Sequence, residues 1–297
     1  MELFSVSTDS TADLYRDTIE NYGIWHVPLT FMMEKDGIIE EKLDEFSSYA
    51  QYKDFYAKLR GGYLSRTAML NYEAHLEHFT KMAKAGVKDV LHFTISSGLS
   101  PTVEVAKQAG EEVKKTYPDF RLFAVDSLTA TVGQGALVRI ALACRDEGMD
   151  AQSAYETVTS LRTKLQHFII ADDLNYLMRG GRLSKTSAIV GGALGIKPML
   201  TFDGKGKLFV LEKCRKMKGA FRSVLEKMEQ LPVDPAYGAV YIVHNDNERD
   251  AEELKTLIER KFGVSPIVSI MGPVIGSHVG PNAVSCCYLS TKERNAF

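Results

Sequence analysis

The chain has 297 residues and a mass of 33.0 kDa, enough for one large domain or two of ordinary size. Its 36 Lys and Arg residues nearly balance 38 Asp and Glu residues, which argues against a nucleic-acid-binding protein that depends on bulk positive charge. A hydrophobic content of 45% with 25% charged residues is typical of a globular chain. No apolar run approaches the roughly 18 residues of a membrane-spanning helix, and the first residues lack a secretory signal pattern.

The four cysteines are Cys144, Cys214, Cys286 and Cys287, and their spacing contains no C-x-x-C pair. We expect buried, reduced thiols in a cytoplasmic protein and no zinc site.

Strands and helices alternate through the first half. We expect strands at 3–8, 24–31, 90–94 and 122–125, and helices ending near Tyr22 and at 72–85, 101–116 and 131–147. This alternation favours a parallel sheet with helices on both faces. Residues 32–62 interrupt it as a small insertion, with a hairpin at Asp36-Gly37 and an amphipathic helix starting at Asp44.

The second half has a different pattern. A helix at 151–165 leads to a strand at 167–171, a helical turn at 174–178 and a hairpin of strands 197–202 and 208–213. The remaining elements are expected to be helices at 217–230 and 247–262, strands at 239–244, 267–270 and 283–289, and a Gly/Pro-rich loop at 272–281. The sequence therefore predicts an α/β protein of two domains, 1–163 with a parallel sheet and 164–297 with a mixed sheet covered by helices on one face.

Small polar residues follow the predicted parallel strands. Ser10, Ser96, Ser97 and Ser127 come directly after strands, and Thr67 lies in the loop after the insertion. Ligands bind beyond the carboxyl ends of parallel strands, where hydroxyls and helix N-termini can hold an anion. The alternative is that each of these residues only caps its helix.

Two segments of the second half add donors. Arg182 follows Gly180-Gly181 and can face a carboxylate or phosphate, and His278 lies among glycines in Gly276–Pro281, where it can donate to an anion or act as a base. A loop histidine bonded to local backbone is the alternative.

Other sites are less well supported. A hydrolase triad of Ser97, His278 and Asp126 lacks the G-x-S-x-G elbow, although a Ser/His-dependent hydrolase or acyltransferase acting on a lipid ester remains the alternative function. His75 and His78 lie three residues apart on a predicted helix, and we interpret them as part of a solvated face rather than metal ligands.

Eight segments in chain order resemble the DegV family, the bacterial fatty-acid-binding proteins that serve as FakB components of the fatty acid kinase system. The most specific are D-D-L-N-Y-L-M-R-G-G-R-L at 172–183, I-K-P-M-L at 196–200 and G-S-H-V-G-P at 276–281. The others are S-T-D-S-T-A-D-L at 7–14, V-P-L at 27–29, T-A-M-L-N at 67–71, S-S-G-L-S-P-T at 96–102 and V-D-S at 125–127.

The resemblance implies a cytoplasmic carrier, without catalytic residues, cofactor or metal, that holds one long-chain fatty acid. Its carboxylate would be bound by Thr67, Ser96 or Ser97 and His278, with Arg182, Ser10 and Ser127 near the head group. A separate kinase subunit would convert the acid to an acyl-phosphate for phospholipid metabolism, docking near Arg215, and the carrier would touch membranes only transiently.

The sequence departs from the family pattern at Ala68, Met69, Pro101 and Asn282. These changes leave the acyl preference and the kinase partnership open. Because a buried methylene is worth ~0.8 kcal/mol, the tail should supply most of the affinity. We therefore expect Ala at Thr67, Ser97 or His278 to weaken phosphorylation more than binding.

Overall fold

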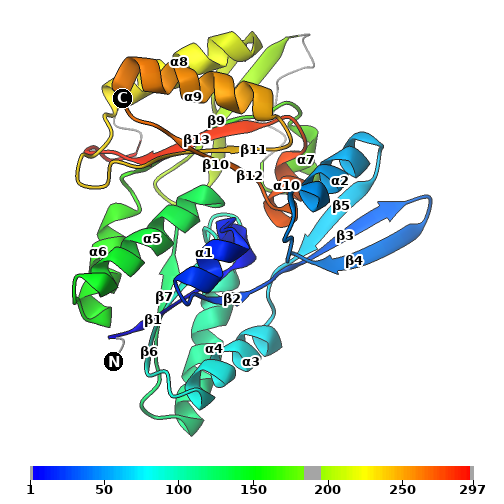
Figure 1. The fold of residues 1–297 in the computed structure, drawn as a ribbon. Coiled ribbons are helices and arrows are strands. Elements are labelled where there is room, and N and C mark those ends of the chain that lie inside the picture. Colours follow the sequence, from blue (N-terminus) through cyan, green and yellow to red (C-terminus); the bar gives the residue numbers. More distant parts are fainter. Residues whose placement is uncertain (1–2, 184–194, 295–297) are drawn as a thin grey trace.

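The computed structural model describes residues 3–183 and 195–294, which form a parallel sheet, a mixed sheet and a small antiparallel sheet (Figure 1). The architecture is mixed α/β, as predicted from the alternation of elements.

The parallel sheet has the strand order β2-β1-β6-β7. Its strands are β1 (Ser5–Asp9), β2 (Trp25–Val27), β6 (Asp89–Thr94) and β7 (Arg121–Asp126), and every pairing is parallel. All five residues of β1 are buried, as expected of a central strand covered on both faces.

Helices cover both faces of this sheet. On one face α3 (Tyr72–Lys84) and α4 (Thr102–Thr116) pack with Val90 of β6, and on the other face α5 (Val132–Asp146) packs with Leu91 and Phe93. The α6 helix (Ala151–Leu161) lies beside α5, and a short turn η1 (Ser10–Ala12) and α1 (Arg16–Asn21) follow β1. The alternation of neighbouring β6 residues between two core clusters is the direct result of the strand pleat.

The interpretation of His75 and His78 as a solvated face was wrong. Both side chains are buried, and Ser7 Oγ lies 2.8 Å from His78 Nε2 and 2.9 Å from His92 Nδ1. His75 Nε2 lies 3.3 Å from Thr102 Oγ1. Hydrogen bonding to these hydroxyls allows imidazoles to lie inside the core, so their polarity does not indicate exposure.

The insertion is larger than predicted and forms its own sheet, in the order β4-β3-β5. The predicted strand at 24–31 is two strands, because β2 ends before Pro28 and β3 (Thr30–Lys35) pairs instead with β4 (Ile38–Leu43) and β5 (Leu64–Ala68). The helix expected from Asp44 begins later, as α2 (Tyr49–Arg60), where Ser48 N donates to Gln51 Oε1 at 3.0 Å.

The mixed sheet has the order β10-β9-β8-β13-β11-β12. Its strands are β8 (Leu165–Ile170), β9 (Ile196–Phe202), β10 (Leu208–Arg215), β11 (Val240–His244), β12 (Ile267–Ile270) and β13 (Val284–Leu289). Only β11 and β12 pair in parallel among these described strands. Helices α8 (Lys216–Gln230) and α9 (Glu248–Phe262) cover one face, as predicted (Figure 1).

The opposite face of the mixed sheet rests on α5. This helix contacts β1 and β6 of one sheet and β11 and β13 of the other, and 11 of its 15 residues are buried. Burial over most of its length is expected of a helix that packs between two sheets. One hydrophobic cluster therefore extends across both sheets, and the predicted boundary near residue 163 stays a prediction.

The prediction of a loop at 272–281 was also wrong. Pro273–Val279 form a helix, α10, with proline at its first turn, and α7 (Asn175–Arg179) packs beside it. Proline is favoured at a helix start because its missing N–H is not needed there.

Candidate functional site

A mainly apolar cavity lies where the three sheets meet. The empty space among its lining residues, open solvent included, is about 720 Å³. A mainly apolar lining with a few polar groups is typical of ligand pockets. Its apolar walls come from the segment after β6, the inner face of β8–β10, and α10, and include Ile95, Leu99, Ile169, Phe202, Leu208 and Val274. Such walls suit an elongated apolar ligand.

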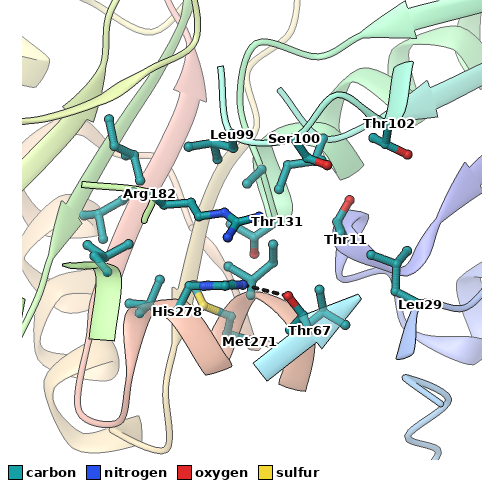
Figure 2. A pocket seen from close by; sticks show the side chains of 18 of the residues that line it. Thr11, Leu29, Thr67, Leu99, Ser100, Thr102, Thr131, Arg182, Met271 and His278 are labelled. Carbon is teal, nitrogen blue, oxygen red and sulfur yellow. Dashed lines mark hydrogen bonds between the residues drawn. The ribbon is translucent and has the colours of Figure 1, made fainter. Parts of the chain in front are cut away.

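A threonine and a histidine supply polar atoms in the wall of this cavity (Figure 2). Thr67 Oγ1 on β5 lies 2.8 Å from His278 Nε2 on α10, so each is the other's hydrogen-bond partner. Arg182 enters the same cavity from the segment after α7 and donates to the carbonyl of Gly180. One hydroxyl, one imidazole and one guanidinium thus converge from separate segments of the chain, a donor set suited to a carboxylate.

The position of His278 depends on close approach to Gly180. A Cβ atom at residue 180 would overlap the ring at Nδ1 and come within 2.9 Å of Cε1. The backbone of Gly180 is helical, with φ −71°, so the glycine serves for space rather than for unusual dihedral angles.

The His278 imidazole is neutral at pH 7. Burial, with a smaller contribution from the nearby charge of Arg182, lowers its pKa to about 4. The neutral ring carries one N–H, so His278 can offer an anion a hydrogen bond but no charge, whereas Arg182 carries a positive charge.

Thr131 lines the cavity and has an unusual backbone. Its φ is 51° with ψ −136°, it is 1% exposed, and it is the residue before α5. A β-branched residue rarely adopts positive φ, so the surrounding structure must hold it there. Neither Thr131 nor the cavity residue Ser100 was among the predicted site residues, and no pattern in the sequence marks the strained position.

Two buried carboxyl groups hold the start of α10. Asp13 Oδ1 accepts from Gly272 N at 2.9 Å, and a backbone hydrogen bond from Val274 helps hold the Asp44 carboxyl. Burial raises the pKa of Asp13 to about 7 and also raises the pKa of Asp44, whose carboxyl faces that of Asp13. These carboxyls position the helix that carries His278.

The structure brings only some of the predicted site residues together. Thr67, Arg182 and His278 line one cavity. The predicted serines have other positions and partners. Ser96 Oγ donates to Gly206 O at 2.7 Å, Ser97 is exposed, Ser127 Oγ donates to Thr129 O at 3.1 Å, and Ser10 Oγ accepts from Leu29 N at 3.0 Å. None of these four serines lines the cavity, and their assignment to the head group stays a prediction.

Arg215 lies apart from the cavity, at the end of β10. It shares a surface groove with Lys213, Lys216, Lys218 and Arg222 at the start of α8. We call the surface formed by these five basic residues the β10–α8 basic groove.

The alternative Ser97–His278–Asp126 triad is not assembled. His278 Nε2 bonds to Thr67, whereas Asp126 Oδ1 accepts from the backbone N–H groups of Ser97 and Leu128, each at 3.0 Å. A general base must reach the proton that it removes, and this geometry does not provide that contact.

Within residues 3–183 and 195–294, no three His, Cys, Asp or Glu side chains are arranged to hold a metal ion. In the same described part of the chain, no helix is both long enough and apolar enough to cross a bilayer.

Comparisons with known proteins give consistent results. The model of the DegV family, described as uncharacterised protein of that family, matches residues 4–291. A DegV domain-containing protein of Clostridium perfringens is 34% identical over 99% of this chain and 100% of its own.

Solved structures agree with these sequence matches. A fatty acid binding DegV family protein from Streptococcus agalactiae is 30% identical, with a TM-score of 0.76 over 98% of this chain and 99% of its own. A DegV lipid binding protein from Thermotoga maritima is 27% identical, with a TM-score of 0.84 over 98% of this chain and 99% of its own. The chain, like these proteins, belongs to the DegV family.

Proposed function

We propose that this protein binds one long-chain fatty acid in the cavity, with the carboxylate held by Thr67 and His278 beside Arg182. The observation that carries the proposal is an apolar cavity in which a hydroxyl–imidazole pair and a guanidinium supply neighbouring polar atoms. The fatty acid binding relatives with the same fold support it.

The tail and the head group of the fatty acid contribute differently to the binding free energy. A tail of roughly fourteen methylenes contributes on the order of 11 kcal/mol before ordering costs, at ~0.8 kcal/mol each. An unpaired buried carboxylate would cost several kcal/mol, so the polar groups prevent a penalty rather than supply most of the affinity. When the acid binds, Thr67 and His278 exchange their mutual hydrogen bond for bonds to the carboxylate.

A second part of the proposal is that the protein presents this carboxylate to a separate kinase and carries out no reaction itself. An outer groove borders Thr67 and His278 and is lined by Arg66, Arg179 and Arg182. Through it the terminal phosphoryl group of ATP, held by the kinase, would reach a carboxylate oxygen, giving an acyl-phosphate and ADP. This partnership places the protein in the cytoplasm.

The β10–α8 basic groove is the surface that we propose for docking the kinase. Arg215 lies in it with three neighbouring lysines and Arg222. Such a cluster favours an acidic partner surface and mainly accelerates association. Charge reversal at Arg215 should therefore slow phosphorylation and leave fatty acid affinity unchanged.

The first test is solvent extraction of the purified protein followed by mass spectrometry. A stoichiometric long-chain acid supports the proposal. Protein that never takes up a fatty acid after delipidation, or that turns over lipid esters, contradicts it.

The second test separates binding from presentation. Thr67→Val and His278→Ala should each reduce phosphorylation by the kinase more than they reduce affinity, because the tail still anchors the acid. Ser97→Ala is the matched control, since that side chain is exposed and does not line the cavity. Equal losses in both assays would count against the proposed division of tasks.

A further inference from the structure

His167 places a polar ring in a cavity wall that is otherwise mainly apolar. It lies on β8, where His167 and Ile169 line the cavity while Phe168 and Ile170 pack into the core cluster beneath α8 and α9. The ring packs against Phe202 of β9, with ring centroids 5.5 Å apart. The strand pleat therefore directs this imidazole to the ligand side of the sheet.

Only one of the two ring nitrogens has a hydrogen bond. His167 Nδ1 lies 3.0 Å from Thr129 Oγ1, whereas Nε2 has no partner among the residues that the structure describes. His167 is 0% exposed, so neighbouring side chains cover the ring in this structure.

In either tautomer of the His167 ring, Nε2 lacks a hydrogen-bond partner. If Thr129 donates to Nδ1, Nε2 carries a hydrogen and needs an acceptor; if Nδ1 donates to Thr129, Nε2 needs a donor. Burial lowers the pKa of His167 to about 3, with a smaller contribution from Arg294, so the ring is neutral in either case. A ligand hydroxyl can donate and accept, and so satisfies both tautomers.

Buried polar groups without partners are rare in proteins because they lose their hydrogen bonds to water. Phenylalanine or leucine at residue 167 would line an ordinary fatty-acid cavity without this loss. An oxygen of the bound molecule near His167 Nε2 would give this nitrogen a hydrogen-bond partner and so account for a histidine at this position.

We propose that the cavity is adapted to a long-chain fatty acid bearing a hydroxyl group along its chain, and that His167 Nε2 is the hydrogen-bond partner of that hydroxyl. This inference rests on the proposed function, since it takes the cavity to hold an acyl chain. It adds a second polar anchor, separate from Thr67 and His278, and names oxygenated acids as the preferred ligand class.

The test is displacement of a fluorescent fatty acid from delipidated protein by octadecanoic acid and by hydroxyoctadecanoic acids with the hydroxyl at successive positions. We expect one narrow range of positions to bind about fivefold to tenfold more tightly than the parent acid, the effect of one additional hydrogen bond. An acid with a methyl group at the same carbon should show no gain, which separates hydrogen bonding from available space.

Two variants connect the preference to the ring. His167→Phe keeps a flat ring without nitrogen and should bind the parent acid at least as well while losing the preference. His167→Gln keeps a donor and an acceptor and should retain part of it. If His167→Phe fails to fold, His167→Gln and the wild-type series still decide the question.

The outcomes distinguish the two proposals. If no long-chain acid displaces the probe, the proposed function itself fails. If octadecanoic acid binds but no hydroxy acid binds more tightly, or if the preference survives in His167→Phe, only the role of His167 is overturned.

Discussion

Substitution of Gly180 by alanine tests whether the position of His278 controls the head-group site. The added Cβ would overlap the imidazole at Nδ1 and lie 2.9 Å from Cε1, so the ring must move. The backbone at this residue has φ −71° and ψ −10°, which alanine adopts without strain. The substitution therefore acts on the histidine and not on the backbone.

The magnitude follows from the hydrogen bonds that a displaced ring cannot make. In the free protein the Thr67–His278 bond is lost, at about 1 kcal/mol of stability. In the complex one hydrogen bond to a charged carboxylate is lost, worth about 1.5–3 kcal/mol, or roughly 10-fold to 140-fold in affinity. The tail contribution is unchanged, so binding weakens but persists.

The assay is a fatty acid titration of delipidated protein, combined with thermal unfolding. Gly219→Ala is the matched control: nothing lies within 4 Å of its Cβ position in α8, so it should leave affinity unchanged and raise stability by up to about 1 kcal/mol. Wild-type affinity in the Gly180→Ala variant would refute the role assigned to the His278 ring.

Three further predictions concern stability. Tyr56→Phe removes the 2.8 Å bond to Met271 O and leaves a buried carbonyl unpaired, so the denaturant midpoint should fall by an amount equivalent to about 1–2 kcal/mol, whereas an unchanged midpoint would contradict this. The pKa of Asp13 is about 7 in the folded protein against 3.8 unfolded, so its contribution to stability is present below pH 4 and lost as the pH rises through about 7. The pKa of His278 is about 4 in the folded protein against 6.5 unfolded, so its contribution is present above pH 6.5 and lost as the pH falls through about 4. Unfolding across this pH range should show Asp13→Asn losing less stability than wild type on the alkaline side, and identical profiles would exclude Asp13 as a source. Arg294→Ala frees three backbone carbonyls bonded at 2.8–3.0 Å and should cost several kcal/mol in urea unfolding, with Arg294→Lys intermediate; a cost below that of an ordinary surface substitution would contradict it.

Sequence patterns predicted those helices and strands whose ends depend on neighbouring residues in the chain. The apolar run at β1 predicted a buried strand, and the glycines that follow first-half helices marked where those helices end. Together they predicted a parallel sheet whose strands are connected by helices. Thr67, Arg182 and His278 were selected from motifs far apart in the sequence, and the structure places all three in one cavity.

Ser96 shows why a predicted site residue can lie outside the cavity: its hydrogen-bond partner is far away in the chain. Ser96 looks like a free hydroxyl at a strand end, but its Oγ donates to the carbonyl of Gly206, 110 residues later. Gly98 permits this approach, since a Cβ there would lie 2.5 Å from the same carbonyl oxygen. No periodicity or turn preference reports a contact between β6 and the β9–β10 hairpin, so the serine could not be separated from a ligand-binding one.

The α10 helix was missed for a related reason, because its glycines serve packing. A Cβ at Gly276 would lie 2.5 Å from Tyr56 Oη, and one at Gly280, where φ is 79°, would lie 2.7 Å from Cγ of Tyr176. Glycine normally disfavours a helix, so the composition of this segment predicts a loop. Here the lost helix propensity is offset by the contacts of two tyrosines that only glycine permits. Because His278 lies between Gly276 and Gly280 in the chain, these two contacts restrain the backbone that carries its ring, which favours a preorganised binding group.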